Sequence, residues 1–290
     1  MTPHATGPTD APSVPAVPPD SPVEAFDRVH AALGHRFRLE RTVAFSAERV
    51  LFQASDKLLR RPVSLRVSFD PDPLVRTWFM REAEALGQLD HPAIRHLYDI
   101  GLEEGFAFRI GNWIEGEGLH QAVQRSVRPI PEVLILTRDL LSAMEHAHAR
   151  GILVRRLVPT SLITNAAGHA TVTDLRYSSY VLPVIPEGER PAGQEFMAPE
   201  VREGETGEPA ADIYTAGATL YYALTGSPPP LDPARLKPPT QLREAAPAVF
   251  DRLLSRALAA DPAERYLTAG EMLEDLAKDA GTFVAPGIVV

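Results

Sequence analysis

The sequence predicts an α+β protein whose first part is rich in strands and whose larger second part is helical. Apolar and polar residues alternate in "FRLERTV", "ERVLFQAS" and "PVSLRVSF" between residues 37 and 70, the pattern of half-buried strands. After residue 114 the apolar residues recur mainly at helical spacing. This change of period indicates two structural parts within one chain of 290 residues.

The individual elements follow from the same patterns. Within the strand-rich part, residues 74–87 have helical spacing, and "GFAFRIGNWI" (105–114) returns to a strand pattern. "SLIT" (161–164) and "ATVTDL" (170–175) flank "NAAGH" and predict a short hairpin. The apolar spacing and the start and stop signals predict helices, in chain order, over residues 133–147, 212–226, 250–258 and 268–276.

Composition excludes several classes of function. The chain has no Cys, so it forms neither disulfides nor thiolate metal sites. Its net charge of −9 argues against general nucleic-acid binding. No apolar run approaches the ~18 residues of a membrane helix, and residues 1–27 lack the basic and apolar regions of a signal peptide. We therefore expect a cytoplasmic protein that binds neither nucleic acid nor membranes.

Both ends of the chain are predicted to lie outside the folded part. Pro, Ala, Thr and Ser dominate residues 1–22, a composition that buries too little apolar surface to fold. We assign residues 1–34 to a disordered tail and residues 280–290 to a C-terminal tail. The domain between them, residues 35–279, is divided at residue 114 into a first lobe (35–114) and a second lobe (115–279).

Six short motifs occur in order along the chain. They are "MREAEALGQLDHPAI" with Glu82, "HAHARGI", "VTDLR" with Asp174, "FMAPE" with Glu200, "ADIYTAGATLYYALTGSPP" with Asp212, and "DPAER" with Arg265. Together they resemble the bacterial, eukaryotic-like Ser/Thr protein kinases over roughly residues 36–279. The resemblance implies a bilobal fold with a small β-rich lobe, a larger helical lobe and a nucleotide cleft between the two.

The catalytic loop departs from the pattern of that family, which is His-Arg-Asp-Leu-Lys-Pro-x-Asn. Arg155, Leu157 and Pro159 match this pattern and define the alignment. Arg156 replaces the catalytic Asp, and a guanidinium can neither accept nor release a proton at ordinary pH. Val158 stands at the position of the phosphate-binding Lys and Ser161 at that of the metal-binding Asn.

The nucleotide-binding motifs are also changed. Ala44, Ser46 and Arg49 take the positions of the glycines whose backbone N–H groups approach the phosphates. Arg66 stands where the lysine of the third strand belongs, and the resemblance implies that it can pair with Glu82. Glu82 could instead be an ordinary surface charge on its helix.

The segment after the catalytic loop keeps one acid and gains a base. Asp174 remains at the metal-binding position, while Arg176 replaces the following glycine, and no threonine occurs between Asp174 and Glu200. We hypothesise a salt-bridge network in place of Mg²⁺, made by Arg66, Arg155, Arg156 and Arg176 with Glu82 and Asp174. The alternative is that the Arg155–Arg156 pair is only a solvated basic patch. His146 and His148, two residues apart on a helix, face different sides and are not expected to share a metal.

Positions with structural roles in the family are retained. The resemblance implies an ion pair between Glu200 and Arg265, and a role for Asp212 in bracing the backbone of the catalytic loop. The combination predicts a pseudokinase that binds a protein partner, with no cofactor expected and at most weak binding of ATP and Mg²⁺. A divergent kinase with slow phosphotransfer and a non-catalytic nucleotide or phosphate sensor are the alternatives.

Overall fold

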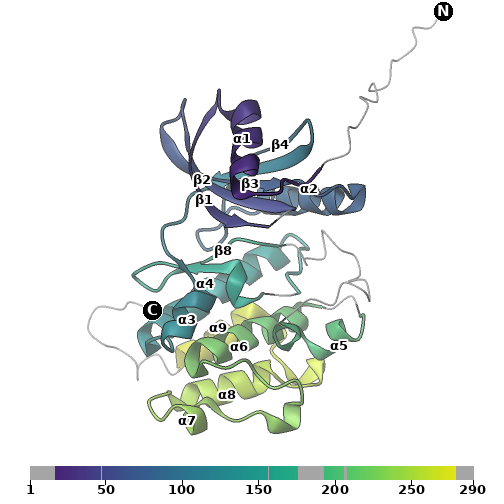
Figure 1. Cartoon of the computed structure of the whole chain (residues 1–290). Helices are drawn as coiled ribbons and strands as arrows, with labels where there is room; N and C mark the ends of the chain where they lie inside the picture. The colour runs from purple at the N-terminus through teal and green to yellow at the C-terminus, as the bar shows by residue number, and fades with distance from the viewer. Residues whose placement is uncertain (1–16, 47, 156, 176–192, 206–207, 279–290) are drawn as a thin grey trace, which may run out of the picture. The chain divides into compact units, whose positions relative to one another are not determined.

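The computed structural model describes residues 17–46, 48–155, 157–175, 193–205 and 208–278, and these form two compact units (Figure 1). The first unit is Met1–Ala83 with Leu97–Trp113, and the second is Glu84–His96 with Ile114–Val290. The α+β class and the kinase-like division into a β-rich and a helical part are confirmed. Arg156 and Arg176 lie outside the described residues, as do the C-terminal tail and most of the N-terminal tail.

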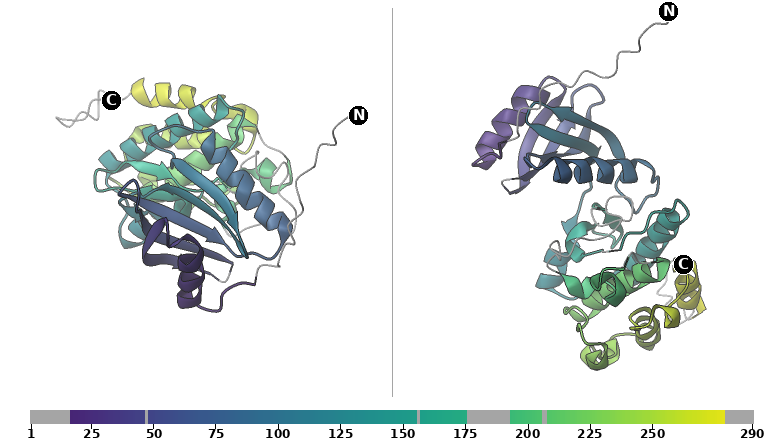
Figure 2. Two further views of the ribbon diagram at one scale, coloured as in Figure 1. Left: turned by 90° about the horizontal axis from the view of Figure 1, so that it is seen from above. Right: turned by 90° about the vertical axis from the view of Figure 1, so that its right-hand side faces the viewer.

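The first unit contains a five-stranded antiparallel sheet. Its strands are β1 (Phe37–Phe45), β2 (Arg49–Asp56), β3 (Arg61–Ser68), β4 (Leu97–Glu103) and β5 (Phe106–Asn112), in the spatial order β1-β2-β3-β5-β4. The helix α2 (Pro73–Gly87) lies beside this sheet (Figures 1 and 2) and crosses from the first unit into the second at Ala83. Alternate residues of β2 are buried, because only one face of the sheet is covered. The period-2 pattern of the sequence correctly indicated this arrangement.

A helix that the sequence analysis placed in a disordered tail packs on this sheet. α1 spans Pro22–Leu33 and packs against β1, with Ala25, Val29 and Leu33 at most 3% exposed. Ser21 caps the helix by accepting the N–H of Glu24 at 3.1 Å. The boundary at residue 34 is therefore wrong for residues 22–33. Apolar residues four apart after an N-cap serine were the overlooked signal, hidden by the proline-rich composition around them.

The second unit begins earlier than the sequence analysis proposed. Residues 84–96 belong to it because they bond to β8 (Ala170–Val172), where Val172 N–H donates to Ala93 O at 2.8 Å and Arg95 N–H donates to Val172 O at 2.9 Å. Strand β8 pairs with β7 (Leu162–Thr164), and β7 pairs with β6 (Glu117–Gly118). The hairpin predicted around residues 161–175 is confirmed by the β7–β8 pair.

Helices form the rest of the second unit. In chain order, the α-helices are α3 (Leu119–Arg125), α4 (Ile130–His148), α5 (Pro199–Arg202), α6 (Pro209–Thr225), α7 (Pro239–Leu242), α8 (Ala248–Ala257) and α9 (Ala269–Lys278). Short 3₁₀ turns occupy Pro159–Ser161, Gln194–Phe196, Pro233–Arg235 and Pro262–Glu264. The helices predicted from residues 133, 212, 250 and 268 onward are confirmed. Among the described residues, no helix is long and apolar enough to cross a membrane.

Helix α6 is the core of this unit. Every residue from Ala211 to Leu224 is buried, and the helix packs against both α4 and α8. It ends at Gly226, whose φ of 79° suits glycine because a side chain would be strained there. A helix buried on all sides can hold polar groups only if they are paired, so its acid and its threonines identify where other chain segments attach.

Candidate functional site

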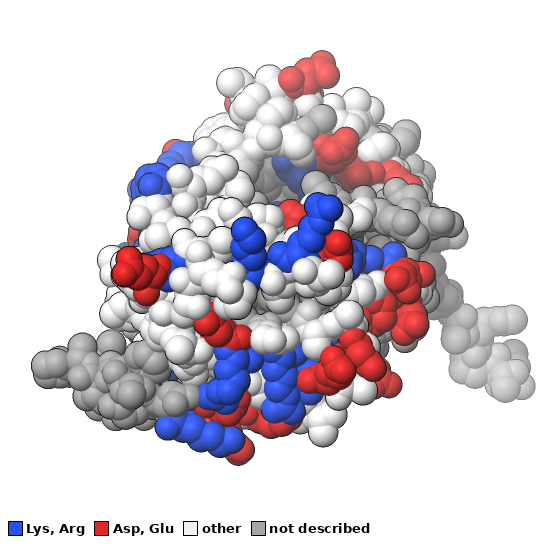
Figure 3. Space-filling model, turned by 90° about the horizontal axis from the view of Figure 1, so that it is seen from below, with Lys and Arg blue, Asp and Glu red and all other residues white. Residues whose placement is uncertain are grey.

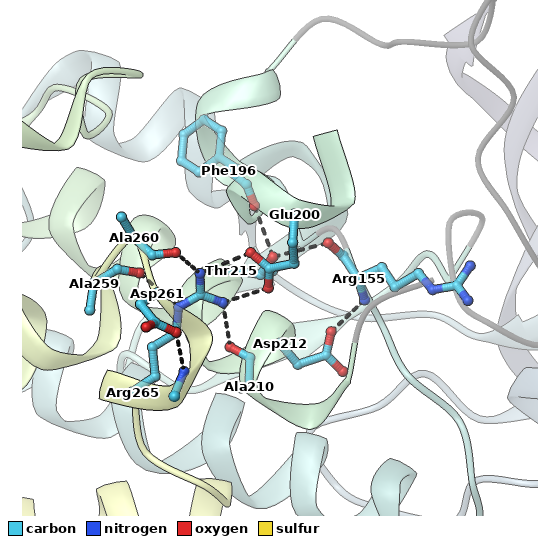
Figure 4. A network of polar contacts seen from close by, with 11 residues as sticks. Arg155, Phe196, Glu200, Ala210, Asp212, Thr215, Ala259, Ala260, Asp261 and Arg265 are labelled. Carbon is cyan, nitrogen blue, oxygen red and sulfur yellow. Dashed lines mark hydrogen bonds and ion pairs between the residues drawn. The ribbon is translucent and has the colours of Figure 1, made fainter. Parts of the chain in front are cut away.

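Asp212 of α6 holds the loop that precedes β7. Its carboxylate is completely buried and accepts the N–H of Val154 at 2.7 Å and that of Arg155 (Figure 4). His148, at the end of α4, lies with Nε2 2.7 Å from the same carboxylate. A buried carboxylate is tolerated when several donors compensate for its lost hydration. The backbone at the catalytic-loop position is thus bound to the central helix.

Two threonines of α6 complete this attachment. The Thr215 hydroxyl lies 3.1 Å from the carbonyl oxygen of Arg155 and 2.9 Å from that of Phe196, so it can donate to either (Figure 4). One turn later, the Thr219 hydroxyl lies 2.9 Å from the carbonyl oxygen of Leu157. These bonds hold Arg155 in the left-handed region, at φ 58°, a conformation that is strained for a residue with a side chain.

Arg155 is not part of a solvated basic patch. The residue is 3% exposed, and its guanidinium extends away from Asp212 and Glu200 (Figure 4). Burial lowers the pKa of Arg155, and the charge of Asp212 partly offsets this effect. The basic-patch alternative is therefore wrong for Arg155, while it stays open for Arg156, which lies outside the described residues.

Two chemistry-bearing positions of the loop that the structure describes, Val158 and Ser161, carry groups without charge. Val158 is 8% exposed and belongs to the apolar core. Ser161 is half-buried, and its carbonyl oxygen accepts the N–H of Thr173 at 2.8 Å and lies 3.1 Å from the Thr173 hydroxyl. No Asp or Glu occurs in the sequence from Gly151 to Thr173. The segment therefore offers no carboxylate that could receive a proton, and Asp174, which is half-buried, is the first acid after it.

The segment ending in "APE" is held by Arg265. Its guanidinium makes a two-pronged contact with Glu200, at 2.7 and 2.9 Å, and donates to the carbonyl oxygens of Ala259 (2.8 Å), Ala210 (3.1 Å) and Ala260 (3.1 Å) (Figure 4). All five N–H groups of this arginine are therefore used. Arg265 is 1% exposed, so the pair is a buried structural anchor rather than a surface contact.

A second buried ion pair lies in the first unit and involves a residue that sequence reasoning missed. Glu82 of α2 accepts from Arg109 of β5 at 2.8 Å, and the side chains are 3% and 4% exposed. Arg109 also lies over the Phe79 ring at 5.3 Å. The surface-charge alternative for Glu82 is therefore wrong. The available signal was an arginine inside the apolar strand "FAFRIG", because a buried charge requires a partner.

Arg66 lies next to this pair. It is directly opposite Arg109 in the register of β3 and β5, so both side chains leave the same face of the sheet. Opposed like charges repel, and an acid close to both reduces that repulsion. The first unit therefore places two arginines and one glutamate where the family pattern has one lysine and one glutamate.

The turn between β1 and β2 is closed by its own hydrogen bonds. Ser46 N–H donates to Arg49 O at 2.8 Å, and Arg49 N–H lies 3.3 Å from Ser46 O and 3.1 Å from the Ser46 hydroxyl. Ala44 is paired with Leu51 within the ladder. Ser46 and Arg49 are two of the three positions that carry glycine in the family pattern. Their N–H groups donate within the turn and so are not available to a phosphate.

The histidines of the "HAHARGI" segment have separate partners. His148 bonds to Asp212, while His146 Nε2 accepts the N–H of Asp90 at 3.2 Å. Within the described ranges, no three His, Asp or Glu side chains are grouped closely enough to hold a metal ion.

The fold and these contacts define a domain of the protein kinase class. Residues 70–275 match the protein kinase domain family, and the chain belongs to this family. It is 28% identical over 269 residues to the serine/threonine-protein kinase PknA of Mycobacterium tuberculosis, covering 86% of this chain and 62% of that protein. It is also 29% identical over 254 residues to PknE of M. tuberculosis and 27% identical over 267 residues to PknB of Mycobacterium leprae.

The match covers different shares of the proteins compared. It includes 81% of this chain and 44% of PknE, and 84% of this chain and 43% of PknB. The chain therefore spans between about two fifths and three fifths of the length of these curated relatives. The salt-bridge network hypothesised in place of Mg²⁺ stays a prediction, since two of its four arginines lie outside the described residues.

Proposed function

We propose that this chain is a catalytically inactive protein-kinase-like domain that acts in the cytoplasm as a regulatory or scaffolding module for a protein partner. One observation carries the proposal. The catalytic-loop backbone is anchored by Asp212, Thr215 and Thr219, yet its chemistry-bearing positions hold Arg156, Val158 and Ser161. The scaffold is kept where it supports folding and changed where it would meet substrate, nucleotide or metal.

The loss of the general base alone has a large expected effect. A positioned general base contributes typically ~10²- to 10⁴-fold to a rate. An arginine at that position cannot accept the proton of a substrate hydroxyl. No carboxylate occurs between Gly151 and Thr173 that could replace the missing Asp.

The nucleotide-binding positions support the proposal independently. Mg²⁺ prefers carboxylate and amide oxygens, and the described residues of the second unit retain only Asp174 of the family's metal-binding pair. In the first unit, Arg109 already neutralises Glu82, and the closed turn at Ser46 and Arg49 uses the N–H groups that would meet phosphates. This set of residues is a poor fit to Mg-ATP and supports at most weak binding of it.

An autokinase assay tests the proposal. The chain is incubated with radiolabelled ATP and Mg²⁺ or Mn²⁺, alone and with a generic basic protein substrate, beside an Asp174→Ala control. We expect no incorporation above that control. Clear incorporation by the unaltered chain that Asp174→Ala removes would refute catalytic inactivity.

A divergent kinase with slow phosphotransfer is the second candidate. Asp174 is retained, and the curated relatives are named serine/threonine-protein kinases. Phosphoryl transfer depends mainly on positioning and electrostatics, so the missing base lowers the rate without abolishing it in principle. The same assay decides between the two candidates.

A sensor of nucleotides or phosphorylated ligands without turnover is the third candidate. The adjacent Arg66 and Arg109, next to a single acid, motivate it. A ligand at 100 times its Kd stabilises the protein by ~2.7 kcal/mol, which a thermal-shift experiment detects. Stabilisation by ATP or inorganic phosphate without incorporation of label would favour the sensor, and the absence of a shift at millimolar concentration would exclude it.

A further inference from the structure

The turn between β2 and β3 exposes apolar and basic side chains together. Residues 57–60, which we call the β2–β3 tip, have the sequence Lys-Leu-Leu-Arg. Leu58 is 85% exposed and Leu59 is 58% exposed. Single exposed leucines are common on protein surfaces, but two neighbouring ones at a strand turn form an apolar contact point.

The tip is rigidly built. Asp56 is 5% exposed, and its Oδ1 accepts the N–H groups of Leu58 and Leu59, both at 2.9 Å. Arg60 N–H closes the turn on Asp56 O at 2.9 Å, and Arg60 adopts a left-handed φ of 52°. The Asp56 carboxylate is bonded to backbone N–H groups beneath the turn. The exposed surface of the tip is therefore basic and apolar.

An open hollow of about 330 Å³ adjoins the tip, lined by Arg38, Ser55, Asp56, Lys57 and Arg60. Arg38 lies 3.5 Å from Glu40, and Lys57 Nζ donates to the carbonyl oxygen of Gly34 rather than to an acid. Within the part of the chain that the structure describes, no acidic side chain pairs with Arg60. The hollow therefore holds three cations that are only partly neutralised.

Exposed cations elsewhere in the chain include some that are directly paired with acids. On the face shown in Figure 3, basic and acidic side chains lie interleaved. In the second unit, Arg256 pairs with Glu271 at 2.6 Å, and Arg252 pairs with Asp275. The described first unit contains equal numbers of Lys/Arg and Asp/Glu, so the net charge of −9 resides almost entirely outside it. The first unit, which carries the tip, therefore has no excess of negative charge that would repel an approaching anion.

We propose that the β2–β3 tip and its hollow bind an acidic segment of a partner protein in which a carboxylate neighbours an apolar side chain. The carboxylate would contact Arg38, Lys57 and Arg60, and the apolar side chain would cover Leu58 and Leu59. A protein segment fits better than an anionic bilayer, since Glu40, 3.5 Å from Arg38, would face the continuous charge of a membrane. This inference does not depend on catalytic inactivity, because an active kinase could use the same surface.

Fluorescence anisotropy of the full chain tests the proposal. The probe is a fluorescein-labelled peptide of leucine and glutamate residues between glycines. Two matched peptides replace either leucine by serine or glutamate by lysine. We expect binding of the first peptide that weakens as salt is added, and at least about tenfold weaker binding of each control peptide.

Matched protein variants locate the binding site. Arg60→Glu and the double variant Leu58→Ser/Leu59→Ser should each weaken binding about tenfold or more. Arg235→Glu and Leu267→Ser are the matched controls in the second unit, where the Arg235 side chain is 81% exposed and Leu267 is 71% exposed. Each control should change binding less than about twofold. Thermal unfolding of each variant reports whether it is folded, and exposed positions such as these are expected to leave the melting temperature unchanged.

Three outcomes would overturn the proposal. One is the absence of measurable binding of the leucine–glutamate peptide at millimolar concentration, or binding that the tip variants leave unchanged. Another is sedimentation of the chain with phosphatidylserine vesicles that the tip variants abolish, which assigns the surface to membranes. The third is self-association in analytical ultracentrifugation that the tip variants abolish, which assigns it to a second copy of the chain.

Discussion

In the described residues of each unit, a buried arginine pairs with a glutamate, and the two pairs are built differently. In the second unit, Arg265 contacts Glu200 and three backbone carbonyls, so one side chain ties together several segments. In the first unit, Glu82 contacts Arg109 from a strand that the family pattern does not use, next to Arg66. Glu82 requires only a nearby cation to compensate its charge, so its partner can change. Arg265 also donates to backbone carbonyls at fixed positions, so another cation cannot take its place.

The largest predicted effect follows from the second unit. Arg265→Leu should lower the free energy of unfolding by about 3–5 kcal/mol, because Glu200, whose side chain is only 12% exposed, and three backbone carbonyls all lose their donor. The double variant Glu200→Leu/Arg265→Leu should remain destabilised by about 3 kcal/mol, because three backbone carbonyls lose their common donor. Urea denaturation measures both, and Arg235→Leu, at an exposed ion pair, serves as the control with a loss below about 1 kcal/mol.

The corresponding variants of the first unit should behave differently. Arg109→Leu should cost about 2–3 kcal/mol, less than Arg265→Leu, because Arg66 still lies near Glu82. The double variant Glu82→Leu/Arg109→Leu should return to within about 1 kcal/mol of the unaltered protein, since it buries no unpaired charge. Equal destabilisation of the two double variants in urea would contradict the proposed difference between the two ion pairs.

A smaller effect is expected at the start of the first unit. Ser21→Ala removes the acceptor for the Glu24 N–H at the beginning of α1 and should cost about 1 kcal/mol. The change should also increase amide hydrogen exchange in the first turn of α1. Ser227→Ala, at an exposed serine in the second unit, is the matched control, and similar exchange in α1 of both variants would argue against the cap.

The smallest effect concerns pH and belongs to the second unit. Burial and the neighbouring His146 lower the pKa of His91, and burial with Arg150 lowers that of His146, while Asp90 opposes both shifts. A pKa below its ordinary value of 6.5 in the folded state means that folding releases protons. The stabilisation is therefore complete well above pH 6.5 and declines as the pH falls through that value.

Denaturation at two pH values measures this effect. The free energy of unfolding should fall between pH ~7.5 and ~5.5 in the unaltered chain. The fall should be smaller in His146→Gln, whose amide can still accept the Asp90 N–H. An unchanged pH dependence in this variant would show that His146 does not contribute.

Most of the second unit could be predicted from sequence because its signals are local and agree with one another. Helix α6 combines a continuous apolar stretch with a terminal glycine, and the Glu200 and Arg265 motifs occur at recognisable spacing. The first unit was harder to predict. Helix α1 follows a proline-rich stretch, so composition concealed its apolar spacing, and Arg109 lies far along the chain from Glu82.

The sequence by itself determined the class of fold, the order of the elements and the loss of acid from the catalytic loop, since each depends on residue type and short-range spacing. Only the tertiary structure decided which arginine neutralises Glu82, that Arg155 is buried, and that Leu58 and Leu59 share a surface with a basic hollow. Ion pairs and surfaces join residues that are distant along the chain. Which of several equivalent cations reaches a buried acid depends on strand register and side-chain direction, and no local pattern records these.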